Sequence, residues 1–376
     1  EYVWLHALRA AGLAPEPATD DEVRDLVTAS DHRSIAVAAE ASGNPVVPLV
    51  SLMRERLDER DPDAARWLHR GLTSQDVLDT ALMLCVRDAI SQVLDHQARQ
   101  VTALRALAER HRRTVRAGRT LTQHAVPTTF GLTAAGWLTG VLDAAENLAG
   151  VRRQLPVQAG GAAGTLAAVV QLAGDPPTAL RVVDAFAAEL ELEPAAPWHV
   201  NRRPVTRVGD ALVTCVDACA RIANDVVVGA RPEIGELHEA APGGSSTMPG
   251  KQNPVLAILV RGAAIGAPFA AARLHAAAAA AVDERPDGAW HAEWPALREL
   301  ARTAVTVASQ TAELLDGLEV DTARMRATAE QAAPRLLAEQ EAMGGTPAQL
   351  ESYLGTADEL VDRAVERADR FIGGWS

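Results

Sequence analysis

A long segment without any helix breaker limits most strongly what this chain can fold into. Residues 78–115 contain no glycine or proline, and apolar residues recur there at mostly three- and four-residue steps. A helix of about 30 residues is about 45 Å long. A rod of that length cannot bury its own apolar side, so we expect partner helices arranged in a bundle.

Other segments predict the partner helices. Helical periodicity covers residues 132–155, 204–228 and 295–318. A further helix is expected to begin at Asn253, because Asn is a good N-cap and Pro254 fits the first helical position. The predicted fold class is therefore all-α, with a helical N-terminal domain over 1–77, a central bundle of long helices over 78–317, and a short helical C-terminal domain over 318–376.

Composition excludes some classes of partner. The net charge of −13 argues against nucleic acid as a partner. No apolar run has the length that a membrane span needs, and no secretory signal is visible. The three cysteines give no disulfide framework and suit the reducing cytoplasm. Two of them, Cys215 and Cys219, are expected to pack in the core, so we predict a cytoplasmic protein without a metal site.

A single lysine stands out in a chain whose other basic residues are all arginine. Lys251 lies in Gly-Gly-Ser-Ser-Thr-Met-Pro-Gly-Lys-Gln-Asn-Pro, residues 243–254. Lysine supplies a compact point charge where arginine supplies a planar fork. A glycine-serine loop that leads into a helix offers backbone N–H groups and a positive helix end to an anion. Serines beside such donors can act as a base or nucleophile. The residues alone leave a flexible linker with an incidental lysine as the alternative.

Three segments together resemble the signature blocks of the fumarase/aspartase superfamily. The loop resembles the signature Gly-Ser-Ser-x-Met-Pro-x-Lys-x-Asn-Pro. Thr-Ser-Gln-Asp at 73–76, followed by Asp-Thr-Ala at 79–81, resembles the first block. Gly-Arg-Thr at 118–120, with Gln123, resembles the second. The blocks follow the order and spacing of the family. Within it, Gly-Ala-Trp-His-Ala-Glu-Trp at 288–294 and Pro-Trp-His at 197–199 are most similar to 3-carboxy-cis,cis-muconate cycloisomerases, which are relatives of adenylosuccinate lyases.

This resemblance implies a three-domain homotetramer with composite active sites and no cofactor. The family reaction eliminates a group from a small anionic dicarboxylate, usually a substituted succinate, and releases fumarate through a carbanion next to a carboxylate. The implied catalytic residues are the base Ser245, with Lys251 and Asn253 holding the carboxylate that accepts charge. The implied substrate-binding residues are Thr73, Ser74, Gln75, Arg119, Thr120, Gln123, His124, Arg202, Arg203, Ser246, Met248, His69 and Arg70.

Two departures from the family pattern suggest a different substrate. Many members have His where this chain has Leu121, and His124 follows at a spacing that places it on a similar helical face; a packed or surface histidine is the alternative. The subgroup reads Gln-Arg-Asp-Arg where this chain has Asn-Arg-Arg-Pro at 201–204, so Arg203 replaces an acid. Neutral drift is the alternative for such changes.

The departures favour a leaving group that is a stable anion, since such a group needs no acid, and whose electron-rich end arginine can hold bidentately. We expect elimination of nitrite from a nitrosuccinate-type substrate. Lactonising muconate cycloisomerisation is the first alternative. A non-catalytic helical assembly protein is the second alternative, and damage to Ser245, Lys251 or Asn253 would favour it; all three are intact.

Overall fold

The computed structural model describes residues 1–15, 24–346 and 349–375. Most of these residues are helical, which confirms the predicted all-α class. The helices are α1 (Tyr2–Ala10), α2 (His32–Ser42), α3 (Val46–Asp58), α4 (Pro62–Trp67), α5 (Ser74–Arg110), α6 (Phe130–Arg152), α7 (Ala167–Ala173), α8 (Pro176–Glu189), α9 (Arg203–Gly229), α10 (Val255–Ala279), α11 (Gly288–Asp316), α12 (Thr322–Leu336), α13 (Ala338–Ala342) and α14 (Ala357–Trp375). The short 3-10 helices are η1 (Arg24–Leu26), η2 (Ala29–Asp31) and η3 (Leu350–Tyr353). The strands are β1 (Val115–Thr120), β2 (Gln123–Thr129), β3 (Leu237–Glu239) and β4 (Leu318–Val320).

The chain divides into two compact units, each built from three segments. The first unit holds Glu1–Asp88, Val151–Arg207 and Arg273–Pro295, and the second holds Ala89–Gly150, Val208–Ala272 and Ala296–Ser376. The three consecutive domains predicted from the sequence stay a prediction.

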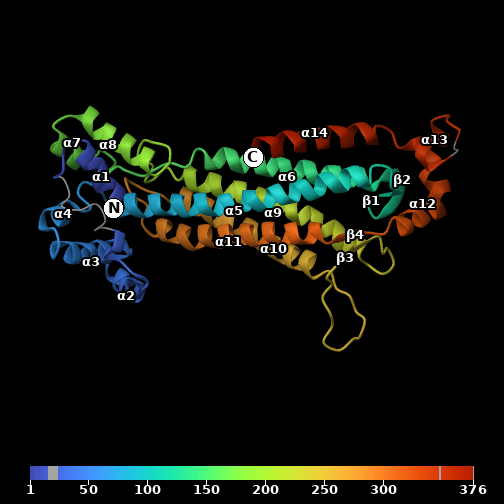
Figure 1. Cartoon of the computed structure of the whole chain (residues 1–376), viewed down its shortest axis with the longest axis horizontal. Helices are drawn as coiled ribbons and strands as arrows, with labels where there is room; N and C mark the ends of the chain where they lie inside the picture. Colours follow the sequence, from blue (N-terminus) through green and yellow to red (C-terminus); the bar gives the residue numbers. More distant parts are fainter. Residues whose placement is uncertain (16–23, 347–348, 376) are drawn as a thin grey trace. The chain divides into compact units, whose positions relative to one another are not determined.

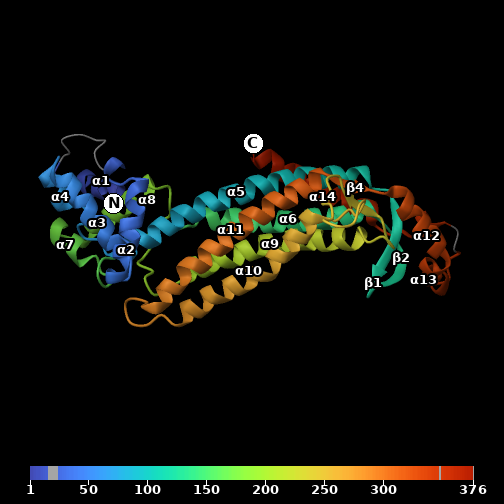
Figure 2. The same ribbon diagram turned by 90° about the horizontal axis from the view of Figure 1, so that it is seen from below.

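Long helices form the core of the second unit, where α6, α9 and α11 run alongside α5 in both views (Figures 1 and 2). Buried residues of α9 recur at alternating steps of three and four, the spacing at which one side of a helix packs against its neighbours. They are Val205, Val208, Leu212, Cys215, Cys219, Ile222 and Val226. The two cysteines therefore pack in the core, as predicted.

Some predicted helix limits are wrong. The helix predicted over 78–115 is α5, which has 37 residues and ends at Arg110. The last predicted residue, Val115, opens β1 instead. The helix predicted from Pro295 is α11, which begins earlier, at Gly288, and contains that proline.

Helix α10 corrects the expectation that no segment could span a membrane. By length and composition it is long and apolar enough to do so, and 28% of its most apolar window is buried. Ile265 and Phe269 are 72% and 73% exposed. An apolar helix that is mostly uncovered in one chain needs a partner surface.

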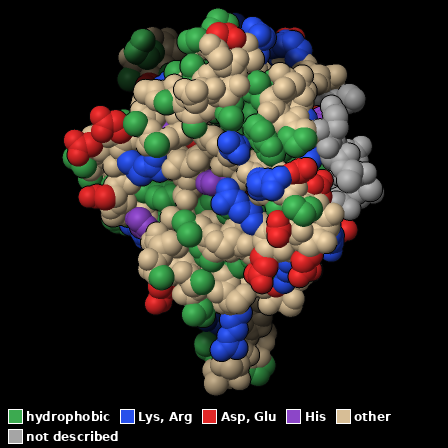
Figure 3. All heavy atoms as spheres, turned by 90° about the vertical axis from the view of Figure 1, so that its left-hand side faces the viewer, with side chains coloured by type: hydrophobic (Ala, Val, Ile, Leu, Met, Phe, Trp, Pro, Cys, Tyr) green, Lys and Arg blue, Asp and Glu red, His purple; other side chains and the backbone are tan. Residues whose placement is uncertain are grey.

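The first unit contains a small apolar core, and both basic and acidic side chains lie on its surface. Leu26, Leu57 and Leu68 are buried together between α3 and α4. The face in Figure 3 shows Lys and Arg side chains gathered near its centre, with Asp and Glu side chains beside them.

Candidate active site

The glycine-serine loop is closed at its base by a two-way backbone bridge. Gly243 and Asn253 exchange N–H···O bonds of 2.9 Å in each direction. The side-chain amide of Asn253 also donates to the carbonyls of Gly243 at 3.1 Å and Gly244 at 3.0 Å. A Cβ on Gly243 would lie 2.1 Å from the side chain of Val255, so this crossing requires glycine. Figure 1 shows the loop projecting from the end of α10.

Within the loop, the hydroxyl of Ser245 accepts two backbone hydrogen bonds. The donors are the N–H groups of Thr247 at 3.3 Å and Met248 at 3.1 Å. Donors aimed at an oxygen stabilise negative charge on it. The arrangement therefore favours Ser245 as a hydrogen-bond acceptor and, after proton loss, as an alkoxide.

Lys251, the single lysine, lies in the same loop, and its side chain is available for binding. Its backbone N–H donates to the carbonyl of Met248 at 3.3 Å, just after Gly250 turns the chain with φ of 80°. Among the residues that the structure describes, none forms a hydrogen bond or ion pair with the exposed Lys251 ammonium. This charge is available to an anionic ligand.

The N-terminus of α10, next to the loop, is already capped by a side chain, whereas the sequence predicted a helix end open to an anion. Helix α10 begins at Val255, not at Asn253. The carboxylate of Glu239 accepts the free N–H groups of Leu256 at 3.2 Å and Ala257 at 2.9 Å. A buried acid thus already occupies the position where an anionic intermediate was expected to bind.

The first block is fixed by buried hydrogen bonds. Asp76 accepts the backbone N–H of Thr73 at 3.0 Å, of Gly160 at 3.0 Å and of Gly161 at 2.9 Å, and it contacts the ring of His199 at 2.8 Å. Thr73 and Ser74 stay partly exposed at the start of α5. Arg285 donates to the Thr73 hydroxyl at 2.8 Å.

Gln75 and Arg202, both predicted to bind substrate, are buried in the interior of the first unit. Gln75 is fully buried and donates to Asp79 at 3.1 Å and to the carbonyl of His199 at 2.9 Å. The Arg202 guanidinium is fully buried between Asp79 and Glu293, with ion pairs of 2.7 Å to each. These contacts engage the Gln75 amide nitrogen and the Arg202 guanidinium, whereas the Gln75 amide oxygen is buried without a hydrogen-bond partner. The substrate-binding role of both residues stays a prediction.

The pKa shifts follow from this burial. Burial raises the pKa of Glu293, and the Arg202 guanidinium offsets that only in part. Burial alone would lower the pKa of Arg202, but the two carboxylates raise it above its ordinary value.

The second block is a β-hairpin, not a helix. Strands β1 and β2 pair antiparallel, with Arg119 opposite His124 and Thr120 opposite Gln123. Leu121 makes the turn with φ of 48° and is 96% exposed. His124 therefore does not lie on a helical face, contrary to the prediction. Strand pairing places His124 opposite Arg119.

This hairpin lines a cavity of about 1010 Å³ within the second unit. Arg119, Thr120 and His124 line it, whereas Gln123 is exposed and donates to its neighbour Thr122 at 3.2 Å. Arg119 also donates to both oxygens of Glu236, at 3.0 and 2.6 Å. The sequence offered no signal for Glu236, which lies 117 residues away from Arg119.

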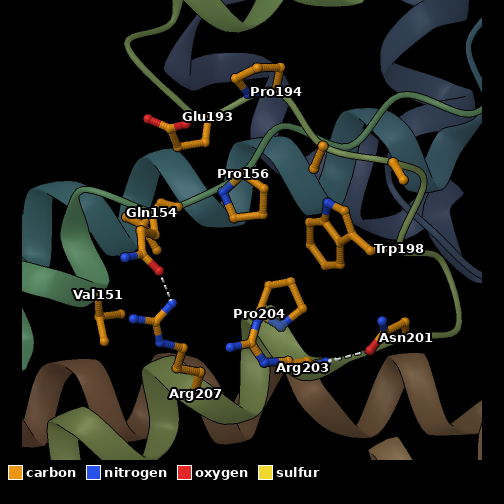
Figure 4. Close-up of a pocket in the computed structure, with 13 residues that line it drawn as sticks. Val151, Gln154, Pro156, Glu193, Pro194, Trp198, Asn201, Arg203, Pro204 and Arg207 are labelled. Carbon is orange, nitrogen blue, oxygen red and sulfur yellow. Dashed lines mark hydrogen bonds between the residues drawn. The ribbon is translucent and has the colours of Figure 1, made fainter.

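The remaining predicted residues lie elsewhere. His69 contacts the carboxylate of Glu1 at 2.7 Å, and Arg70 stacks over Trp67 at 4.6 Å. Ser246 and Met248 are exposed in the loop. Arg203 lines a separate crevice of about 330 Å³ with Pro156, Trp198 and Arg207 (Figure 4). No group of three or more His, Cys, Asp or Glu within the described ranges could hold a metal ion.

Comparison with known proteins adds to this geometry. The model of a family described as lyase matches residues 16–267. The chain belongs to this lyase family, the fumarase/aspartase superfamily. It is 46% identical to a nitrosuccinate lyase from Streptomyces davaonensis over 350 residues, which are 90% of this chain and 74% of the relative. It is 38% identical to a 3-carboxy-cis,cis-muconate cycloisomerase from Bradyrhizobium diazoefficiens over 376 residues, 98% of this chain and 81% of the relative.

A solved structure agrees. The 3-carboxy-cis,cis-muconate lactonizing enzyme from Pseudomonas putida superposes with a TM-score of 0.86 at 30% identity, over 99% of this chain and 93% of that one. The predicted family, fold class and enzyme class are confirmed: the chain is a lyase of this superfamily.

Proposed function

We propose that the chain catalyses β-elimination from a nitro-substituted succinate, releasing fumarate and nitrite. The observation that carries this proposal is the state of the loop: two backbone N–H groups point at the Ser245 hydroxyl, and the Lys251 ammonium of the same loop is unpaired within the described part of the chain. A base and a cation for an anionic intermediate are thus held in one closed loop.

The reaction proceeds in two bond changes. The Ser245 alkoxide takes the proton from the carbon beside a carboxylate, and the electron pair spreads into that carboxylate, where the Lys251 ammonium offsets the charge. Asn253 holds the loop closed through its amide donors to Gly243 and Gly244. The pair then forms the C=C bond as the C–N bond breaks, and nitrite leaves with the bonding electrons. Thr73 and Ser74 hold the other carboxylate. The steps use only groups of the chain itself.

Nitrite is favoured as leaving group because the second block offers no buried acid. Leu121 is a fully exposed turn residue, and His124 is exposed on its strand. A leaving amide nitrogen would need a proton from such a group, whereas nitrite is stable without one. The 46% identity to a nitrosuccinate lyase supports this choice.

Muconate lactonisation remains the second candidate. Its support is the cycloisomerase relative at 38% identity and the superposed lactonizing enzyme. Its leaving group in the reverse direction is a carboxylate, which also needs no acid. The third reading, a non-catalytic assembly protein, loses its support because the chain belongs to a lyase family and retains Ser245, Lys251 and Asn253.

The active enzyme is proposed to be a cytoplasmic homotetramer. Helix α10 exposes Ile258, Leu259, Ile265 and Phe269, of which the least exposed is 48% accessible. Other copies of the chain would cover this apolar face and bring the three blocks together from different subunits. We assign this face to subunit contact rather than to a membrane, and no nucleic acid partner is proposed.

The test compares Ser245→Ala with Thr247→Ala, which removes an exposed hydroxyl of the same loop, using nitrosuccinate as substrate. Loss of a general base costs about 10²- to 10⁴-fold in rate. Ser245→Ala should lose kcat by that factor with KM nearly unchanged, while Thr247→Ala keeps most activity. Fumarate is followed by ultraviolet absorbance and nitrite by colorimetry. A Ser245→Ala variant with near-normal kcat would refute the assigned base.

A further inference from the structure

Two arginines of the hairpin share one buried carboxylate unequally. Arg119 donates to both oxygens of Glu236, at 3.0 and 2.6 Å. Arg116, on the same strand, approaches no closer than 3.7 Å, which is too long for a hydrogen bond. The side chain of Glu236 is 2% exposed. Since Arg119 neutralises this carboxylate, the second guanidinium is a surplus positive charge.

The surplus charge is held in a largely dry place. The Arg116 side chain is 18% exposed, and its Nε is buried without a hydrogen-bond partner. None of the residues that the structure describes forms a hydrogen bond with the Arg116 guanidinium. Burial lowers the pKa of Arg116, and Glu236 offsets this only in part. Proteins rarely bury a donor in this way unless something else binds it.

The cavity beside Arg116 leaves room for a ligand, and its other charged groups are mostly committed. Arg324 donates to the backbone carbonyls of Ile234 at 2.9 Å and Glu233 at 3.3 Å. Arg221 forms an ion pair with Asp225. The exposed Arg231 lies at the chain turn after α9 and also lines the cavity. Arg116 is thus the buried guanidinium here that an anion could engage.

We propose that Arg116 is a substrate-binding residue of the second block. It offers a forked pair of N–H donors to a planar anionic group with two oxygens, a carboxylate or a nitro group. Arg119 is then a positioning residue, which neutralises Glu236 and leaves Arg116 free. This assignment rests on the proposed function for its substrate, and it adds a residue that the family pattern of the second block does not include.

The test replaces Arg116 by Gln and uses Arg231→Gln as the matched control, because both changes remove one positive charge from the same cavity. A hydrogen-bonded charge contributes roughly ten- to a hundredfold to binding. Arg116→Gln should raise KM for nitrosuccinate, and the inhibition constant of fumarate or nitrite, by that factor, with a smaller change in kcat. Arg231→Gln should change each by less than twofold. Arg116→Lys should recover only part of the loss, because it restores charge without the fork.

A purely structural role would give a different pattern. Arg116 has no hydrogen bond to lose, so we expect the Tm of Arg116→Gln to equal or exceed that of the wild type. A lowered Tm with unchanged KM and inhibition constants would overturn the proposal, as would full recovery by lysine.

The proposal can be separated from the proposed function by calorimetry. If the wild type does not turn over nitrosuccinate, the proposed function fails. Titration of the full-length enzyme with fumarate and with nitrite then decides the role of Arg116. Weaker binding of either anion by Arg116→Gln supports the substrate-binding role of Arg116. The anion whose binding is weakened shows whether Arg116 engages a carboxylate or the nitrogen-oxygen group. Equal binding by both proteins, or no binding by the wild type, overturns it.

Discussion

Replacing Arg202 by Met should destabilise the first unit more than almost any other single change. Its guanidinium donates to both oxygens of Asp79, at 2.7 and 3.0 Å, and to Glu293 at 2.7 Å, and it stacks over Trp198 at 4.8 Å. Without it, two carboxylates that are 0% and 1% exposed would lose the cation between them, although Asp79 would keep its hydrogen bonds from Gln75 and Trp290. Removing one partner of a buried pair costs about 3–5 kcal/mol, and two orphaned acids place the expected cost near the upper value.

The matched changes are Arg203→Met and Glu293→Gln. Arg203 is the next residue, is exposed, and makes no ion pair in the described part of the chain, so its loss should cost less than about 0.5 kcal/mol. Glu293→Gln removes one of the two acids that share a single cation. It should cost only about 1 kcal/mol, the usual net value of a hydrogen bond.

Glu293 also gives the cluster a pH dependence of known sign. Its pKa in the folded chain is raised above the ordinary 4.5, so the folded state holds this proton more tightly than the unfolded state does. Its contribution to stability is therefore complete below pH 4.5 and is lost as pH rises through the higher folded-state pKa. The difference in stability between wild type and Glu293→Gln should change over that window and be flat above it.

Urea unfolding followed by circular dichroism measures all three variants. A cost below about 1 kcal/mol for Arg202→Met, or an equal cost for Arg203→Met, would contradict the stabilising role of the buried cluster, since Arg202 is buried with two acids and Arg203 is not.

Two further substitutions and one labelling experiment test other parts of the structure. Glu239→Ala removes the cap of α10 and should cost about 1–2 kcal/mol in urea unfolding; an unchanged midpoint would contradict the capping role. Phe269→Glu should dissociate the proposed tetramer in light scattering, and an unchanged mass of the assembly would exclude α10 from the interface. At pH 8 a disulfide reagent should label the exposed Cys85 alone, because burial raises the pKa of Cys215 to about 12 and of Cys219 to about 11; three labelled thiols in the native enzyme would contradict their burial.

The long helices were predictable because their signal is local. The three-and-four spacing of α9 and the absence of breakers in α5 each specify a helix with one packed side. The hairpin at 115–129 was missed because apolar and polar residues alternate there only over Val-Arg-Ala at 115–117, too short a run to indicate a strand. Its turn uses Leu121 and Thr122 at positive φ, 48° and 69°, where glycine or asparagine is the usual signal.

The sequence predicted the part of the candidate site that lies in one segment. It did not predict the parts that depend on contacts between residues far apart in the chain. The glycines, serines and lysine of 243–251 indicated a loop that accepts anions. The cap on α10 comes from Glu239, 17 residues before Leu256. Arg202 finds its acids 123 and 91 residues away. Sequence alone shows an arginine in a family motif, but not that two buried carboxylates surround it.

The most direct test of the central claim is product analysis with the wild-type enzyme. Nitrosuccinate should be converted to fumarate and nitrite in equal amounts, at a rate that depends on Ser245, while 3-carboxymuconate yields little lactone. Rapid lactone formation without nitrite release from nitrosuccinate would contradict the proposed elimination and establish the cycloisomerase instead.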